Sequence, residues 1–310
     1  MINGIKSVRE GGKRALSEAL ALTEHSFDNE TTIELLDEAY GSATAHVVGF
    51  TGPPGVGKST LINGLIKEWR RRDQTVGVIA IDPSSHKTGG ALLGDRTRMI
   101  TDPEDQGIFV RSLASRGQLG GVAQLTFPAL VLMRALFDIV IIETVGVGQS
   151  EADITSHADS VILCVQPGSG DSLQFMKSGI MEIPDIAVVT KADIGAQARR
   201  AEADLKGALS ITNYEPGQHE TVVLSVSAAK EEGLSGLIDA IDGHYQTLLD
   251  NKILEKGRET QAIKWLQDRI LNEYGSKGLS LVEKSLSSGI ERPFKKQHFV
   301  LNGLITSFRG

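Results

Sequence analysis

The stretch from Gly52 to Thr60, GPPGVGKST, combines the residue types that hold the phosphates of a nucleotide. Its glycines, lysine and serine match the pattern G-x-x-x-x-G-K-[ST]. Glycine lets backbone N–H groups turn toward phosphate oxygens, the Lys58 ammonium reaches the outer phosphates, and the Ser59 hydroxyl can ligate magnesium. We therefore expect a nucleoside triphosphate here, with contacts from Gly52, Pro53, Pro54, Gly55, Val56, Gly57, Lys58, Ser59 and Thr60.

The apolar run at 138–144 brings a carboxylate, Glu143, toward the same place, and Gly146 follows it. A carboxylate at a strand end beside a phosphate loop is placed for the second shell of a magnesium ion, and a glycine there lets a backbone N–H approach the γ-phosphate. GTPases commonly have Asp at the first of these positions, so Glu143 is a departure. The alternative is an acidic residue that merely ends a strand.

Further candidate ligands follow the run at 75–82. Asp82 closes that run, and Asp95 lies in a glycine-rich segment with Arg96 and Arg98. Ligands of open parallel sheets bind at the carboxyl ends of the strands, so these residues indicate contacts to magnesium-bound water and phosphate; a polar surface loop is the alternative. The candidate metal ligands are Ser59, Asp82, Asp95 and Glu143, and the candidate catalytic residues are Lys58, Asp82, Asp95, Glu143 and Gly146.

The sequence TKAD, from Thr190 to Asp193, follows another apolar run and is typical of a loop that reads a guanine base. A carboxylate at Asp193 accepts hydrogen bonds from the ring N–H and exocyclic amine of guanine, whereas adenine would leave it unpaired. The Lys191 stem packs along the base. Asn is commonest at the position of Thr190, and a hydroxyl there is expected to weaken binding of the base. The Ser227–Ala228 pair, after the run at 221–227, is the expected companion, with a backbone N–H toward the guanine carbonyl.

The residue after Gly146 is Val147, which cannot orient an attacking water as the glutamine of other GTPases does. Gln149 and Gln118 are the available substitutes. The sequence therefore predicts slow intrinsic hydrolysis that needs a partner. The segment from Gln166 to Asp185 is a candidate reporter loop, with an ordinary strand-to-helix connection as the alternative.

These motifs need a sheet to position them, and short β-branched runs alternating with helical stretches predict one. Such alternation indicates an α/β fold with a largely parallel sheet and helices on both faces. We expect a helical extension at 1–44, a nucleotide-binding core at 45–250 and a helical arm at 251–310. The predicted strands are 46–51, 75–82, 107–112, 138–144, 160–166, 185–191 and 221–227; the predicted helices include 60–72, a candidate at 125–137 that starts or kinks at Pro128, 259–275 and 279–291.

Composition excludes several classes of protein. The net charge of -7 over 310 residues argues against nucleic acid as the main partner, and the run Arg70–Arg72 is expected to be the solvated end of a helix. The single cysteine, Cys164, lies in an apolar run and is expected to be buried and inert. No signal peptide or spanning run is visible, so we expect the cytoplasm, or an organelle matrix after removal of an import peptide. No Cys/His tract offers zinc or nickel ligands.

The motifs together resemble the MeaB/ArgK family of P-loop GTPases, the methylmalonyl-CoA mutase-associated GTPases that include the methylmalonic aciduria type A proteins. The resemblance runs from 11 to about 250 and rests on the long motifs AHVVGFTGPPGVGKSTL, IDPSSHKTGGALLGDRTRM, SRGQLGG, ETVGVGQSE, PGSGD and VVTKAD. It implies a P-loop NTPase fold of the SIMIBI class. Thr190 and Gln118 depart from the family pattern, which often has Asn and His there.

The resemblance also implies a function. Members of this family are chaperones of adenosylcobalamin-dependent methylmalonyl-CoA mutase or a related mutase, and they gate cofactor loading and protect the enzyme through GTP binding and hydrolysis. It implies Mg²⁺ around Ser59, Asp82, Asp95 and Glu143, switches at 146–149 and 171–177, and a homodimer through the C-terminal arm, with no nucleic-acid or membrane partner. The alternatives are a metal-insertion GTPase, an ATP-dependent kinase linked to amino-acid transport, and a structural partner protein with a vestigial site.

Overall fold

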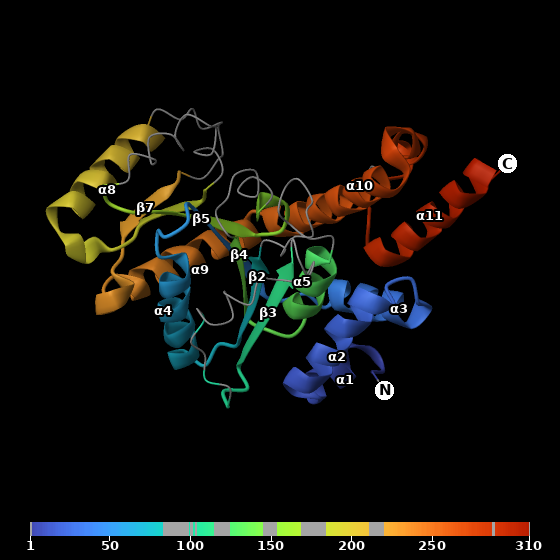
Figure 1. The fold of residues 1–310 in the computed structure, drawn as a ribbon, viewed down its shortest axis with the longest axis horizontal. Coiled ribbons are helices and arrows are strands. Elements are labelled where there is room, and N and C mark those ends of the chain that lie inside the picture. The colour runs from blue at the N-terminus through green and yellow to red at the C-terminus, as the bar shows by residue number, and fades with distance from the viewer. Residues whose placement is uncertain are drawn as a thin grey trace, which may run out of the picture. The chain divides into compact units, whose positions relative to one another are not determined.

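The computed structural model describes residues 2–82, 99, 102, 104–114, 125–144, 154–168, 184–210, 220–286 and 289–309. The chain forms two compact units. A helical unit comprises Met1–Ala45, Gln124–Asp138 and Lys252–Gly310, and a sheet unit comprises His46–Ala123 and Ile139–Asn251. The helical segments at the two ends of the sequence thus contribute to one unit, together with a central segment around α5 (Figure 1).

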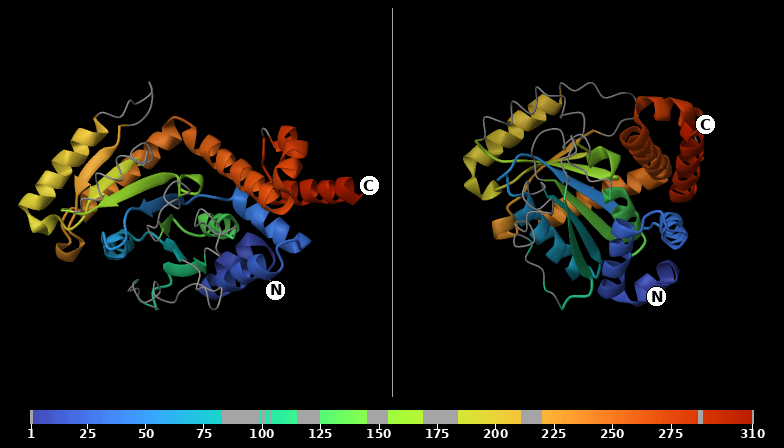
Figure 2. Two further views of the ribbon diagram at one scale, coloured as in Figure 1. Left: turned by 45° about the horizontal axis from the view of Figure 1, so that its top comes forward. Right: turned by 45° about the vertical axis from the view of Figure 1, so that its right-hand side comes forward.

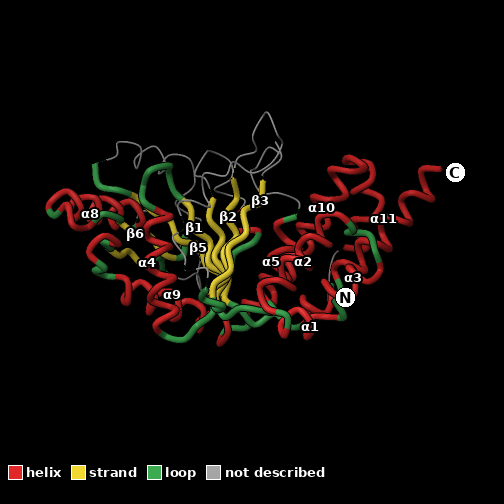
Figure 3. Tube along the Cα trace, turned by 60° about the horizontal axis from the view of Figure 1, so that its bottom comes forward, coloured by secondary structure: helices red, strands yellow, loops and turns green. Residues whose placement is uncertain are grey.

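The sheet unit contains one seven-stranded sheet in the order β3-β2-β4-β1-β5-β6-β7 (Figure 3). Every neighbouring pair of strands is parallel, so all strands end at the same edge. The predicted fold class is therefore confirmed, and each predicted strand is present within a few residues of its expected bounds. The strands are β1 His46–Thr51, β2 Val76–Asp82, β3 Ile108–Ala114, β4 Ile139–Thr144, β5 Ser160–Val165, β6 Ile186–Val189 and β7 Val222–Ser225.

Alternating side chains of β5 face two different layers of helices. Ile162 and Cys164 belong to the buried cluster formed with α4 (Lys58–Arg71) and α9 (Leu234–Asp250). Leu163 and Val165 belong to the cluster formed with α8 (Ala196–Leu209) on the other face. Because successive side chains of a strand point to opposite faces, the apolar run Val161–Val165 of β5 is buried only with helices on both sides. Short 3₁₀ helices lie at Ile154–Ser156, Ala192–Ile194 and Ala228–Lys230.

An aromatic cluster forms the centre of the helical unit. Trp265 packs against Phe127 and Phe294 with ring centroids 5.0 and 4.9 Å apart, and Phe27 contacts Trp265 at 6.1 Å. These rings come from segments far apart in the sequence, so the cluster joins the N-terminal, central and C-terminal segments of the helical unit, whose ribbons are blue, green and red in Figure 2. The helices are α1 Gly4–Glu10, α2 Gly12–His25, α3 Glu30–Gly41, α5 Thr126–Arg134, α10 Ile253–Val282 and α11 Pro293–Arg309, with a 3₁₀ helix at Glu283–Leu286.

Several local details differ from the sequence-based expectation. Helix α3 begins after Asn29, whose side chain accepts a hydrogen bond from the Thr31 amide and so caps the helix N-terminus. Pro128 lies in the first turn of α5, where a missing N–H costs nothing. Helix α10 is kinked at Gly275, with φ 66° and ψ -174°. Helix α11 lies within the helical arm expected at 251–310, although no separate helix was named at 293–309. Within the described part of the chain, no helix is long and apolar enough to cross a membrane.

Candidate nucleotide-binding site

The loop between β1 and α4 depends on glycine at three positions. Gly52, Gly55 and Gly57 have φ values of 135°, 76° and 102°, which other residues rarely adopt. A Cβ atom at Gly52 would lie 2.2 Å from the carbonyl oxygen of Cys164 on β5. The loop can therefore bend over the strand ends only with glycine here, and it leads directly into the N-terminus of α4, where backbone N–H groups attract anions.

Lys58 is the first residue of α4, and its side chain is only 6% exposed. Its Nζ donates hydrogen bonds to the carbonyl oxygens of Gly52 at 2.6 Å and Pro53 at 3.1 Å. The ammonium thus lies against the backbone carbonyls of the loop, where it places a positive charge beside the start of α4. A cation so placed is suited to neutralise the outer phosphates of a nucleotide.

Ser59 and Glu143 are brought together, as the sequence analysis expected for a magnesium site. The Ser59 hydroxyl donates to Glu143 Oε1 at 2.7 Å, and the Glu143 side chain is 7% exposed at the end of β4. A hydroxyl and a carboxylate are hard oxygen donors of the kind Mg²⁺ prefers, with phosphate and water completing the shell. This donor pair fits the ion. Among the described residues, no three His, Cys, Asp or Glu side chains gather into a metal-binding cluster.

The other predicted magnesium and switch residues are placed only in part. Asp82 ends β2 at the same edge of the sheet, one position beyond the pairing of Ile81 with Thr144 in β4, but its side chain is not among those described. Asp95 and Gly146 lie outside the described residues. So do the other residues proposed for switching and water orientation: Arg96, Arg98, Gln118, Val147, Gln149 and the segment 171–177.

Thr190 ties the predicted base-reading loop to the phosphate loop. Its backbone N–H donates to the Val165 carbonyl at 2.8 Å, and its hydroxyl lies 2.7 Å from the Val56 carbonyl oxygen and 3.0 Å from that of Val165. The side chain is buried, so these hydrogen bonds are shielded from water. The threonine that departs from the usual asparagine therefore joins the two nucleotide loops. Its effect on the base remains a prediction.

Lys191 also reaches across to the phosphate loop. Its backbone is left-handed, with φ 54°, and its Nζ donates to the Gly55 carbonyl at 3.1 Å and to Gln166 Oε1 at 2.6 Å. Gln166 follows β5 directly; the sequence predicted it as the end of a strand at 160–166 and as the start of a candidate reporter loop. Its side chain anchors the Lys191 head so that the aliphatic stem spans the space between the two loops.

The Asp193 carboxylate is positioned by Ser227. The Ser227 hydroxyl donates to Asp193 Oδ1 at 2.6 Å, and this hydrogen bond holds the pKa of the Asp193 carboxyl below its usual value. Ser227 is itself fixed by a backbone bridge to Glu232, while Ala228 begins the 3₁₀ helix that follows. The sequence predicts a backbone contact from the Ser227–Ala228 pair, and the contact of the Ser227 hydroxyl with Asp193 was not foreseen. Only the residue type, a serine beside the base-reading loop, pointed to it.

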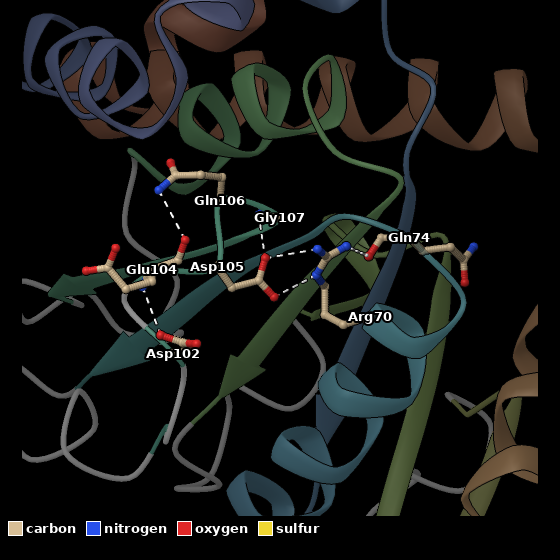
Figure 4. Close-up of polar contacts among 7 residues, drawn as sticks. All are labelled: Arg70, Gln74, Asp102, Glu104, Asp105, Gln106 and Gly107. Carbon is tan, nitrogen blue, oxygen red and sulfur yellow. Dashed lines mark hydrogen bonds and ion pairs between the residues drawn. The ribbon is translucent and has the colours of Figure 1, made fainter.

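The far end of α4 carries ion pairs. Arg71 and Arg72 are exposed, as expected for a solvated helix end, whereas Arg70 is half-buried, which corrects the expectation for that residue. Arg70 binds both oxygens of Asp105 at 2.9 Å and donates to the Gln74 carbonyl at 2.9 Å (Figure 4). Asp105 in turn accepts from the Gly107 amide. Helix α4 therefore has a fixed position behind the phosphate loop. Arg71 pairs with Glu68 and Glu231, and Arg72 with Asp239 and Asp242.

The chain resembles known proteins over most of its length. The sequence pattern of the family described as methylmalonyl Co-A mutase-associated GTPase MeaB matches residues 16–279. A Pyrococcus abyssi (strain GE5) relative is 43% identical over 259 residues, covering 82% of this chain and 79% of the relative. The mitochondrial methylmalonic aciduria type A homolog of Mus musculus is 33% identical over 317 residues, covering 94% and 76%.

A solved structure has the same fold. The crystal structure described as LAO/AO transport system kinase superposes with a TM-score of 0.68 at 23% sequence identity, covering 100% of both chains. At that identity the likeness concerns the fold alone. The family match and the relatives, taken with the phosphate loop and the TKAD loop beside it, lead to one conclusion: the chain belongs to the MeaB family of P-loop GTPases.

Proposed function

We propose that the chain binds GTP with Mg²⁺, hydrolyses it slowly to GDP and phosphate, and uses the nucleotide state to assist an adenosylcobalamin-dependent methylmalonyl-CoA mutase. The observation that supports GTP binding is a set of hydrogen bonds between the TKAD loop and the phosphate loop. Thr190 and Lys191 of the TKAD loop hydrogen-bond to Val56 and Gly55 of the phosphate loop. These hydrogen bonds support the proposal that base reading and phosphate binding belong to one site.

Guanine selection follows from the carboxylate of Asp193. Its lowered pKa keeps it ionised, so it accepts hydrogen bonds and donates none. Guanine offers it two N–H donors, whereas adenine offers no ring N–H at that place. An acceptor left without a donor loses the hydrogen-bond energy that the guanine complex gains. We therefore infer that GTP is strongly preferred to ATP.

The hydrolytic step is assigned to groups around the γ-phosphate. Lys58 and the N-terminal amides of α4 would hold the transferring phosphoryl group and stabilise its developing charge. Ser59 and Glu143 would hold magnesium, and Asp82, Asp95 and Gly146 are proposed to complete this site. A bound Mg²⁺ would supply neutralisation of the negative charge on the phosphates. The Val147 side chain offers no hydrogen bond to the attacking water. We therefore propose that a partner protein supplies the group that orients this water.

The partner role is proposed from the family. The family description names association with methylmalonyl-CoA mutase, and the mouse relative is named for methylmalonic aciduria. A ligand shifts a conformational equilibrium only through contacts that differ between the two states. The γ-phosphate is the group that GTP has and GDP lacks, so the switch segments that approach it would report the nucleotide state to the mutase. We further propose that the protein acts as a homodimer.

The experiment that tests this proposal compares nucleotides and partner together. Binding of the purified chain to a mutase from the same organism is measured by calorimetry with GTP analogue, GDP, ATP analogue and no nucleotide. The proposal expects GTP and GDP to compete for one site, ATP to bind far more weakly, and mutase affinity to differ between the GTP and GDP states. Tighter binding of ATP would favour the kinase alternative. Equal mutase affinity in all nucleotide states would contradict the timing role.

A further inference from the structure

A carboxylate outside the nucleotide motifs, Glu202, connects helix α8 to the end of strand β7, against which that helix packs (Figure 1). Glu202 Oε2 accepts a hydrogen bond from the Ser225 hydroxyl at 2.6 Å, and its Oε1 accepts one from Lys206 Nζ at 2.7 Å. These hydrogen bonds, from Lys206 and Ser225, hold the pKa of the Glu202 carboxyl below its usual range. The group is therefore ionised at neutral pH, and the nucleotide site described above gives it no role.

Side chains at the end of β7 alternate between two layers. Leu224 and Val226 pack with the cluster of α4 and α9, whereas Val223 packs with the cluster of α8. Because alternate side chains of an extended chain point to the same face, Ser225 and Ser227 follow Val223 toward α8; the Ser227 backbone is extended, with φ -113° and ψ 100°. The hydroxyl bonded to Glu202 and the hydroxyl bonded to Asp193 thus lie on the same side of one short segment.

Strand β7 is secured by the sheet from one side. In the described part of the chain it is the last strand, and β6 is its neighbour. An edge strand has no second ladder of backbone hydrogen bonds along its outer side. The Val226 N–H donates to the Val189 carbonyl of β6 at 2.9 Å, and the Ser225 hydroxyl adds a hydrogen bond to α8. Because its acceptor is ionised, this second bond is stronger than one between neutral groups.

We propose that Glu202 is a positioning residue of the guanine site: it fixes the end of β7 on α8, so that Ser227 keeps its hydrogen bond to Asp193 and GDP is released slowly. This inference rests on the proposed function, because it requires that Asp193 binds the guanine base. Ser227 lies two residues after Ser225, and Asp193 lies just before α8 begins. Loss of the Glu202–Ser225 bond would therefore free both partners of the Ser227–Asp193 bond to move apart.

The contact of Glu202 with Lys206 is a less direct candidate. These residues are four apart on one helix, and the Lys206 side chain is exposed. Such a pair contributes little to stability and is screened by salt. It also lies within α8 and connects that helix to nothing else. The bond to Ser225 is thus the contact that an experiment must remove.

The test uses the full chain and two readouts of the guanine site. Release of a fluorescent GDP analogue is followed by stopped flow, and equilibrium affinities are measured for GDP and for inosine diphosphate, whose base lacks the exocyclic amine. Glu202→Ala and Ser225→Ala remove the hydrogen bond from its two sides, and Glu202→Gln keeps an acceptor oxygen. The matched control is Asp204→Ala, which removes an exposed acid from the same helix. Urea denaturation reports the stability of each variant.

The inference expects both Glu202→Ala and Ser225→Ala to release GDP at least about threefold faster, as for the loss of one hydrogen bond. The preference for GDP over inosine diphosphate should fall in both, because Asp193 no longer meets the exocyclic amine in the right position. Glu202→Gln and Asp204→Ala should behave like the wild type. When Ser227→Ala is already present, adding Glu202→Ala should change GDP release much less, since the two residues act along one path.

Three results would overturn the inference and leave the proposed function standing. One is wild-type GDP release in both Glu202→Ala and Ser225→Ala. Another is a loss of stability with an unchanged preference for GDP over inosine diphosphate, which would show a merely structural role. The third is an undiminished effect of Glu202→Ala when Ser227→Ala is present. A wild-type chain that binds GDP no more tightly than ADP would instead contradict the proposed function itself.

Discussion

The Thr190 hydroxyl lies 2.7 Å from the Val56 carbonyl oxygen, so a side chain of the base-reading loop is bonded to the backbone of the phosphate loop. Replacing Thr190 by valine keeps the shape and removes this hydrogen bond. We expect GDP to dissociate roughly tenfold faster, about 1.4 kcal/mol, as for a buried hydrogen bond that is lost. Stopped-flow release of a fluorescent GDP analogue measures this. Thr190→Ser keeps the hydroxyl and should release GDP at nearly the wild-type rate; equal rates in all three proteins would rule out the role.

Gly52 allows the phosphate loop to pass directly over β5. Alanine at this position would place a Cβ atom 2.2 Å from the Cys164 carbonyl oxygen and force a φ of 135° on a residue with a side chain. We expect Gly52→Ala to lower the free energy of unfolding by about 2 kcal/mol or more and to abolish nucleotide binding. Urea denaturation provides the measurement.

The matched control for that substitution is Gly243 in α9. It is exposed, it is helical, and a Cβ atom there would meet nothing within 4 Å. Gly243→Ala should raise the free energy of unfolding by about 0.5–1 kcal/mol, because alanine is the better helix former. If both alanine variants changed stability in the same direction, the argument from the loop backbone would fail.

The Asp193 carboxyl has a lowered pKa because Ser227 donates a hydrogen bond to its ionised form. Because the pKa of Asp193 is lowered in the folded protein, the stabilisation from its hydrogen bond with Ser227 is fully present above the pKa of the unfolded chain. This stabilisation is lost as the pH falls through the folded-state pKa. GTP affinity should therefore persist into acidic buffer below the usual range of an aspartate. In Ser227→Ala the decline should begin at a higher pH. Titrating GTP affinity between pH 7 and the limit of folding tests both statements; superimposable profiles would contradict them.

Cys164 is fully buried on β5, and burial raises the pKa of its thiol to about 12. The thiolate is the reactive form of cysteine, so the folded protein should not react with a disulfide reagent at neutral or mildly alkaline pH. Absorbance of the released thiolate should rise only as urea unfolds the chain, in step with circular dichroism. Full reaction of the native protein would show that β5 opens far more readily than its packing suggests.

The local parts of this fold could be predicted from sequence because local patterns encode them. All seven strands were predicted from β-branched runs. The spacing of Gly52, Gly57 and Lys58 alone predicted the phosphate loop. The strand order could not be predicted, since it depends on contacts between distant segments. For the same reason Arg70 was expected in solvent, although Asp105, which binds it, lies 35 residues away.

In the candidate site, too, some contacts could be predicted from the sequence and others could not. The sequence placed Ser59 with Glu143 and Asp193 with Ser227 in one site, and the hydrogen bonds join both pairs. The bridging role of Thr190 was invisible because it depends on the path of two backbone loops. The bounds of helix α11 within the expected helical arm could not be predicted, because Asp37, far away in the sequence, accepts the hydrogen bonds of the Phe294 and Lys295 amides.

The central claim is that GTP hydrolysis by this chain is a timer read by a mutase. Its most direct test is the single-turnover rate of GTP hydrolysis by the purified chain, alone and with an adenosylcobalamin-dependent methylmalonyl-CoA mutase from the same organism. The account predicts a rate far below about 1 per second alone and a strong increase with the mutase, as for GTPases whose partners complete the site. A rate near 1 per second without any partner, or a slow rate that the mutase leaves unchanged, would contradict it.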